Sequence, residues 1–134
     1  MMPQITGEFD VTITPETLSD TAAQSGLGRL SLDKRYHGAL DARAQGEMLS
    51  ARAGVAGSAG YVALERVEGT LDGRQGSFYL QHSGSMARGT PSLSVTVVPD
   101  TGTGQLQGLH GSLAIRIADG KHYYDFTYDI SEAP

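Results

Sequence analysis

The sequence predicts an all-β protein, an antiparallel up-and-down barrel of about eight strands. Three observations support this prediction. Apolar and polar residues alternate along several stretches, two Asp-Gly pairs each lie between two such stretches, and 18 glycines are available for bends. Strands joined by short turns form a sheet whose edges must be protected, and closure into a barrel removes the edges. A β-sandwich is the alternative architecture.

Size and charge limit the classes of function. A chain of 134 residues suits one domain, which we expect to span residues 1–134. The net charge of −5 argues against a nucleic-acid partner, and the absence of cysteine excludes disulfides and thiolate chemistry. The start of the chain lacks the features of a signal peptide, and no apolar stretch approaches the roughly 20 residues that span a bilayer. We expect a soluble, cytoplasmic protein with no membrane partner.

The first third of the chain contains two predicted strands. Apolar residues alternate with polar ones between residues 4 and 13, which predicts the first strand. Residues 15–26 have no such period, so they form a loop or a single helical turn, a lid-like connection. In residues 27–40, Leu30, Leu32, Lys34 and Tyr36 share one face. Lys34 is the polar member of this otherwise apolar stripe.

The next segment alternates poorly. Residues 43–53 predict a strand, but Glu47 and Leu49 share one face while Met48 and Ser50 share the other. The pattern therefore leaves open which face points inward. Residues 53–60 consist of small residues, which either turn or let two backbones approach closely.

The central hairpin, residues 61–86, is the most informative part of the sequence. Asp72-Gly73 is typical of a two-residue type I′ turn, which fixes the register of the two strands. One face of the hairpin is apolar except for Glu65 and His82, which lie diagonally across the pair. The predicted cross-strand pairs are Leu71–Arg74, Val67–Phe78, Glu65–Leu80, Ala63–His82 and Tyr61–Gly84.

A second hairpin is predicted at the end of the chain. Residues 109–117 and 122–130 flank Asp119-Gly120, the second Asp-Gly turn. Between the two hairpins, residues 87–91 predict a connection, residues 93–97 a strand and residues 99–104 a loop. The pairs predicted for the second hairpin are Ile117–His122, Ile115–Tyr124, Leu113–Phe126 and Gly111–Tyr128 on one face, and Arg116–Tyr123, Ala114–Asp125 and His110–Asp129 on the other.

Four segments carry a family resemblance. They are GSAGYVALERVEGTLDGRQGSFYLQHSG at 57–84, SVTVVPDTGTGQLQGLHGSLAI at 94–115, DKRYHG at 33–38 and HYYDFTYDI at 122–130. Together they resemble a family of small bacterial proteins classified as a domain of unknown function. The resemblance implies a calycin-like barrel similar to plant allene oxide cyclase, and no assigned reaction. The cyclase uses a glutamate and a water held partly by an asparagine, but this sequence contains no asparagine, so no cyclase residue is transferred.

Three ionisable residues are candidates for chemistry. Lys34, Glu65 and His82 each lie on an apolar stripe, so an interior shared by all three would bring them together. Burial and mutual proximity can set a general acid or base near neutral pH, which makes Glu65 and His82 the candidate catalytic pair. The alternative is that Glu65 forms a structural ion pair with Lys34 or His82, because such networks also perturb pKa values.

Aromatic residues on the predicted inner face line a cavity or simply form the core. A barrel of about eight strands is near the size at which side chains fill the interior or leave room for one small ligand. We expect a small apolar or amphipathic ligand in the interior. The residues expected to contact it are Lys34, Tyr36, Tyr61, Glu65, Phe78, His82, Tyr124 and Phe126.

Other types of site are not indicated. The four histidines lack metal-binding spacing, so no metal and no cofactor are expected. His110 opposite Asp129 resembles part of a catalytic triad, but both lie on the solvated face and no GxSxG motif is present. The GTG at 102–104 precedes a strand rather than a helix, which makes these glycines turn residues instead of a phosphate loop.

Three hypotheses of function follow from the sequence. The first is a barrel that binds a small molecule, with Glu65 and His82 orienting its polar end. The second is a cyclase- or isomerase-like enzyme in which the same two residues act as acid and base. The third is a structural or assembly protein with a filled barrel. Val62, Leu64 and Tyr79 on the outer face suggest a homo-oligomer, with a dimer favoured.

Overall fold

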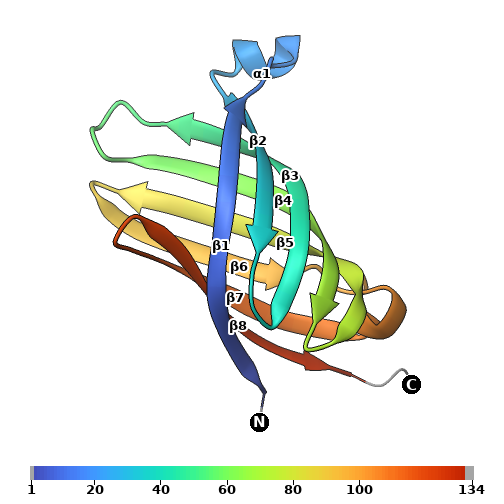
Figure 1. Ribbon diagram of the computed structural model, residues 1–134. Coiled ribbons are helices and arrows are strands. Elements are labelled where there is room, and N and C mark those ends of the chain that lie inside the picture. The colour runs from blue at the N-terminus through green and yellow to red at the C-terminus, as the bar shows by residue number, and fades with distance from the viewer. Residues whose placement is uncertain (1, 132–134) are drawn as a thin grey trace.

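Eight antiparallel strands close into a barrel in the computed structural model, which describes residues 2–131. Each strand pairs with the next in sequence, and β8 pairs with β1 to complete the wall (Figure 1). The up-and-down barrel is confirmed, and the sandwich alternative is wrong. The strands are β1 (Gln4–Pro15), β2 (Gly28–Tyr36), β3 (Leu40–Arg52), β4 (Ala59–Leu71), β5 (Arg74–Ala87), β6 (Thr90–Val97), β7 (Leu109–Ala118) and β8 (Lys121–Ile130).

Both Asp-Gly turns form as predicted. Asp72 and Gly73 have φ values of 49° and 80°, and Asp119 and Gly120 have 52° and 75°. Positive φ at both central residues defines the type I′ turn, whose twist matches that of the flanking strands. Every predicted pair in the two hairpins is present in the register of β4 with β5 and of β7 with β8.

The structure differs from the sequence prediction at residues 87–91 and at the end of the first strand, whereas the helical turn that was one alternative for residues 15–26 is present. Residues 87–91 do not form one connection, because only Arg88 and Gly89 turn, with φ of 50° and 89°, and β6 begins at Thr90. Residues 15–26 contain one short helix, α1 (Asp20–Gln24), capped by the hydroxyl of Ser19. The first strand also continues two residues further than predicted, to Pro15.

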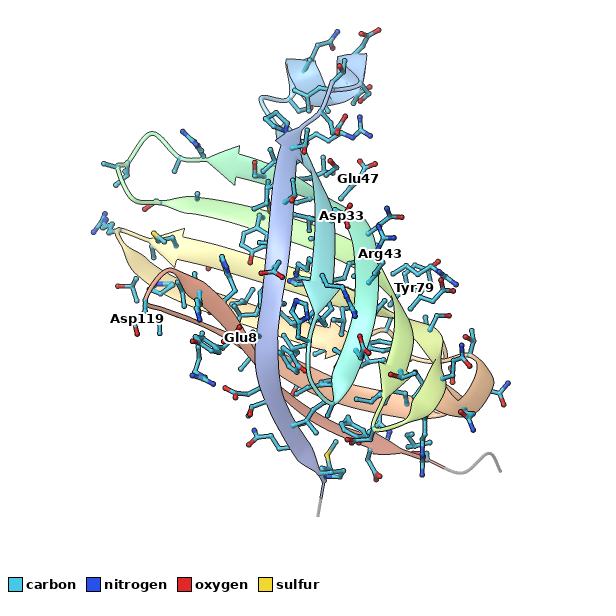
Figure 2. All side chains as sticks on the ribbon, in the orientation of Figure 1. Glu8, Asp33, Arg43, Glu47, Tyr79 and Asp119 are labelled. Atoms are coloured by element: carbon cyan, nitrogen blue, oxygen red, sulfur yellow. The ribbon has the colours of Figure 1, made fainter. Side chains whose placement is uncertain are left out.

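The inward face of β3 is the even-numbered one. Ala42 and Ala44 are buried, whereas Arg43 and Glu47 are exposed. Figure 2 shows Arg43 and Glu47 pointing away from the barrel, together with Asp33 of β2 and Tyr79 of β5. The inward residues in the first half of β3 are small, so the hydrophobic pattern did not show which face of this strand points into the barrel.

The interior divides into a filled half and an open half. At the filled end, residues 98–108, which include the short 3₁₀ helix η1 (Gly104–Leu106), run beside the first part of β5, and Leu106 is 1% exposed. The hairpins around residues 53–58, 88–89 and 119–120 lie at the opposite end (Figure 1). Side chains that fill the first half include Tyr36, Leu40, Leu71, Phe78, Leu106, Leu109, Leu113, Tyr124, Phe126 and Tyr128.

Strand β1 changes its partner at Phe9. Gln4 to Phe9 pair with β8, whereas Phe9 to Pro15 pair with β2. The last six residues of β1 therefore extend beyond the ladder that closes the barrel. The contact between β6 and β7 is also limited, since Thr96 and Ser112 form the one registered pair between these strands.

Candidate functional site

The predicted ionisable residues meet at the boundary between the filled and open halves. Lys34 comes from β2, Glu65 from β4 and His82 from β5, and all three side chains point inward because of the strand alternation. They are 6%, 1% and 3% exposed, respectively. Tyr36, two residues after Lys34 on the same face, is fully buried beside them.

Glu65 is the centre of this cluster. Its Oε2 lies 2.8 Å from Nζ of Lys34 and 2.6 Å from Nε2 of His82, and its Oε1 accepts a hydrogen bond from the hydroxyl of Tyr36. Nζ of Lys34 also lies 3.5 Å from the Tyr36 oxygen and 5.1 Å from the ring centroid of Phe9. Buried charges are tolerated when they are paired and hydrogen-bonded in this way.

The surroundings of Glu65 keep it ionised. Burial by itself would raise the pKa of this carboxyl, but the hydrogen bond from His82 and the charge of Lys34 outweigh it and lower the pKa from 4.5 to about 2. Burial and the adjacent carboxylate raise the pKa of Tyr36 well above 10, so its hydroxyl stays protonated and donates a hydrogen bond to Glu65. An ionised Glu65 only accepts, so Nε2 of His82 carries the proton of their hydrogen bond.

The other ring nitrogen of His82 faces the open half. No hydrogen bond joins Nδ1 to another residue of the described chain. Within residues 2–131, every fully enclosed polar side-chain atom has a hydrogen-bond partner, so Nδ1 is not fully enclosed. Nδ1 is therefore accessible from the cavity that His82 lines. In the uncharged imidazole with hydrogen on Nε2, this nitrogen is a hydrogen-bond acceptor.

The open half contains a cavity of about 820 Å³. Its walls are mostly apolar, and Lys34 and His82 supply the ionisable groups at its inner end. Gly84 makes room for the ring of Tyr61, since a Cβ at position 84 would lie 2.3 Å from that ring. Residues that line the cavity include Phe9, Val11, Ile13, Leu30, Leu32, Met48, Tyr61, Ala63, Met86, Leu93, Ile115 and His122.

The predicted ligand contacts divide between the two halves. Lys34, Tyr61 and His82 line the cavity, whereas Glu65 lies behind them and is not part of its surface. The remaining four predicted residues belong to the filled half. There Phe78 stacks on Phe126 with centroids 6.0 Å apart, and the hydroxyls of Tyr36 and Tyr124 are used internally.

Sequence reasoning missed most of the cavity wall. Phe9 and Val11 come from β1, Ile115 from β7 and His122 from β8, and His122 packs on Phe9 with ring centroids 5.2 Å apart. The alternation of β1 was the available signal, since it places Phe9, Val11 and Ile13 on one face. Their depth along the barrel was not encoded in that pattern.

The other candidate motifs form no site. His110 and Asp129 face each other in the register, but Nδ1 of His110 lies 3.3 Å from both the carbonyl oxygen of Gly108 and the hydroxyl of Ser131. Within residues 2–131, no group of three or more histidine and acidic side chains is arranged to hold a metal ion. The described chain also contains no helix that is long and apolar enough to cross a membrane.

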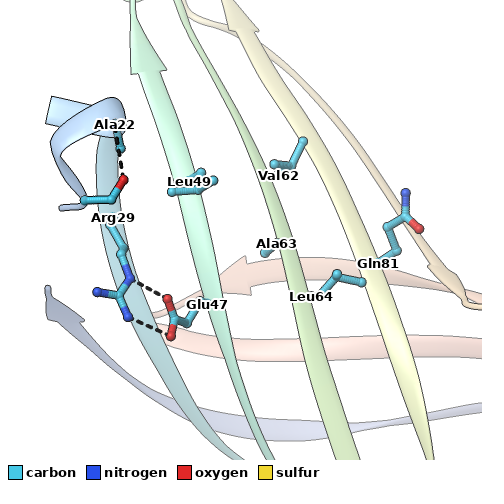
Figure 3. A pocket seen from close by; sticks show the side chains of 9 residues that line it. Ala22, Arg29, Glu47, Leu49, Val62, Ala63, Leu64 and Gln81 are labelled. Carbon is cyan, nitrogen blue, oxygen red and sulfur yellow. Dashed lines mark hydrogen bonds and ion pairs between the residues drawn. The ribbon is translucent and has the colours of Figure 1, made fainter. Parts of the chain in front are cut away.

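A second hollow lies outside the barrel, between α1 and the outer surface of β3 and β4 (Figure 3). Its volume is about 730 Å³, and Ala22 of α1, Leu49 and Val62 contribute to its lining. Arg29 and Glu47 form a two-bond ion pair at its edge, with N–O distances of 2.5 and 2.9 Å. No residue of 16–27 lines the inner cavity, so the connection that was expected to be lid-like borders this outer hollow instead.

The fold and cavity define a class, a closed eight-stranded antiparallel barrel with one filled and one open half. A protein-family model described as "Protein of unknown function (DUF3224)" matches residues 5–128, and the chain belongs to this family. A solved structure of a DUF3224 protein of unknown function from Shewanella oneidensis MR-1 is 52% identical and has a TM-score of 0.92. That match covers 99% of this chain and 100% of the other. No curated protein matches the chain.

Proposed function

We propose that this protein binds a small apolar or amphipathic molecule in the open half of the barrel. The observation that carries the proposal is an apolar cavity whose inner end is formed by Lys34 and His82, both held by Glu65. The apolar part of the ligand lies between β1, β2 and β7, and its polar end lies against these two side chains. Glu65 orients that end through Lys34 and His82.

The size and composition of the cavity support this proposal. Ligand pockets typically have volumes of about 300–1,000 Å³, with apolar walls and a few placed polar groups. The volume of about 820 Å³ lies in this range. A filled barrel, the third hypothesis from the sequence, would have packed both halves with side chains. Here only the half beyond Glu65 is packed in that way.

Titration with an environment-sensitive apolar fluorophore tests the proposal. Ala63 lines the cavity, whereas the side chain of its neighbour Leu64 is 52% exposed on the outer face. We expect Ala63→Phe to weaken probe binding at least tenfold by occupying the cavity, and Leu64→Phe to leave it unchanged. Equal binding by both variants, or no binding by the natural protein, would contradict the proposal. Native mass spectrometry of the purified protein would identify any ligand that copurifies.

A second candidate function is a cyclase- or isomerase-like enzyme, which the orientation of His82 favours. Its Nε2 is fixed by Glu65 while Nδ1 faces the cavity, an arrangement that suits a general base. Lys34 would stabilise negative charge that develops on an oxygen of the substrate. With a bound compound in hand, Glu65→Gln should abolish turnover and leave binding nearly intact. If Glu65→Gln instead lost the ability to bind the compound and showed no separate effect on turnover, the result would count against catalysis.

A further inference from the structure

The hydrogen-bonding groups that face the cavity define the polar end of the ligand more closely. Lys34 has three ammonium hydrogens, and the described residues offer it two acceptors, Glu65 Oε2 at 2.8 Å and the Tyr36 oxygen at 3.5 Å. One N–H is therefore available to a ligand in the cavity that Lys34 lines. Beside it, in the uncharged imidazole with hydrogen on Nε2, Nδ1 of His82 offers a lone pair. The inner end of the cavity thus presents one donor and one acceptor.

We infer that the ligand ends in an uncharged hydroxyl, an alcohol or a phenol, which accepts from Lys34 and donates to His82. This inference rests on the proposed function and specifies its ligand class. A hydroxyl has both a lone pair and a hydrogen, so it satisfies the two groups at once. An ether or ketone accepts from Lys34 but leaves Nδ1 without a partner.

Charge supports an uncharged end. The carboxylate of Glu65 is neutralised by Lys34, at an N–O distance of 2.8 Å, so this pair carries no net charge. A carboxylate ligand would bring no hydrogen to Nδ1, and an ammonium ligand would place a second cation beside Lys34. A buried charge or acceptor without a partner is costly, so a carboxylate group and an ammonium group each fit the site less well than a hydroxyl.

Three probes of nearly equal shape test this inference by calorimetry: para-butylphenol, para-butylanisole and butylbenzene. The anisole differs from the phenol by a methyl group on oxygen, which removes the hydrogen and keeps the acceptor. We expect the phenol to bind about tenfold more tightly than the anisole, since the anisole displaces water from Nδ1 without replacing its hydrogen bond. In His82→Phe the preference disappears, and in His110→Phe, which changes an exposed histidine, it remains.

The outcomes separate this inference from the proposed function. If the phenol and the anisole bind equally well, the hydroxyl assignment is overturned while the proposed function stands. If none of the three probes binds, the proposed function itself fails.

Nitrogen-15 NMR of the histidine rings provides a test in the natural protein. His82 should carry hydrogen on Nε2, and its Nδ1 resonance should move with the phenol and not with the anisole. A hydrogen on Nδ1 of the free protein would overturn the inference.

Discussion

His82 and Glu65 lie diagonally across neighbouring strands, with 2.6 Å between Nε2 of the imidazole and Oε2 of the carboxylate. The Asp72-Gly73 turn sets this relationship, because it pairs Ala63 with His82 and Glu65 with Leu80. A turn of two residues thus fixes the geometry of a hydrogen-bonded pair whose members lie seven residues before Asp72 and nine residues after Gly73.

Removal of the buried lysine should be costly. Lys34→Met leaves the carboxylate of Glu65 without its cation, and we expect it to lower the free energy of unfolding by about 3–5 kcal/mol. Lys121→Met is the matched control, since Lys121 is exposed and lies 3.8 Å from the carboxylate of Glu8. Loss of that surface pair should cost less than about 1 kcal/mol. Urea denaturation of both variants measures the difference, and equal losses would contradict the prediction.

Stability should fall in acid because of Glu65. Its pKa in the folded protein is lowered from 4.5 to about 2, so the folded state binds this proton less readily than the unfolded state. The resulting stabilisation, about 3 kcal/mol, is complete above pH 4.5 and is lost as the pH falls toward 2. Urea unfolding at a series of pH values should show this loss in the natural protein and a smaller one in Glu65→Gln. Parallel pH profiles would rule out the assignment to Glu65.

The central turn should require glycine at position 73. Gly73 has φ of 80°, and a Cβ added there would meet no heavy atom within 4 Å, so the cost of Gly73→Ala comes from the backbone alone. We expect it to lower the free energy of unfolding by about 1–2 kcal/mol. Gly54 has equally open space and lacks the positive φ, so Gly54→Ala should be neutral or slightly stabilising. Thermal unfolding compares the two, and a neutral Gly73→Ala would refute the turn argument.

The expected homodimer would use the outer face of β2–β5. Leu49, Val62, Leu64 and Tyr79 are 41%, 55%, 52% and 41% exposed there, so the face is apolar at its centre. The chain has a net charge of −5, but the outward-facing charges of β2–β5 sum to zero. A second copy of the chain would therefore meet little electrostatic repulsion on this face. Those charges are Arg29, Arg35, Arg43 and Arg66 against Asp33, Asp41, Glu47 and Glu68.

Light scattering coupled to gel filtration tests the dimer. We expect Leu64→Glu to convert the protein to monomers. Ile117→Glu, which changes a residue that is 70% exposed at the open end, should leave the dimer intact. A natural protein that is already monomeric at micromolar concentration would end this proposal.

The sequence predicted what depends on alternation and turn chemistry. The two Asp-Gly turns determined register, and register placed Glu65 and His82 on one inner face. The inner position of Lys34 followed from the stripe that it shares with Leu30, Leu32 and Tyr36. Alternation distinguishes inside from outside, but it carries no information on depth along the barrel axis. For that reason the sequence could not show that Tyr61 lines the cavity whereas Tyr124 is packed in the filled half.

Two further features required the structure for different reasons. The inward positions of β3 near Tyr36 are Ala42, Ala44 and Gly46, whose small side chains give too little hydrophobic contrast to orient a strand. The hydrogen bond of Tyr36 to Glu65 depends on the curvature of the wall, which brings β2 and β4 together across β3. Residue patterns in the sequence predict pairing between adjacent strands. They do not predict a contact between two strands that are separated by a third.

The change of partner at Phe9 leaves the last six residues of β1 attached to the sheet along one edge. Along this segment one edge of the backbone is tied to β2, and the amide and carbonyl groups of the other edge rely on solvent. Val11 and Ile13 lie on this segment, so part of the cavity entrance is formed by a strand whose outer edge has no ladder partner in β8.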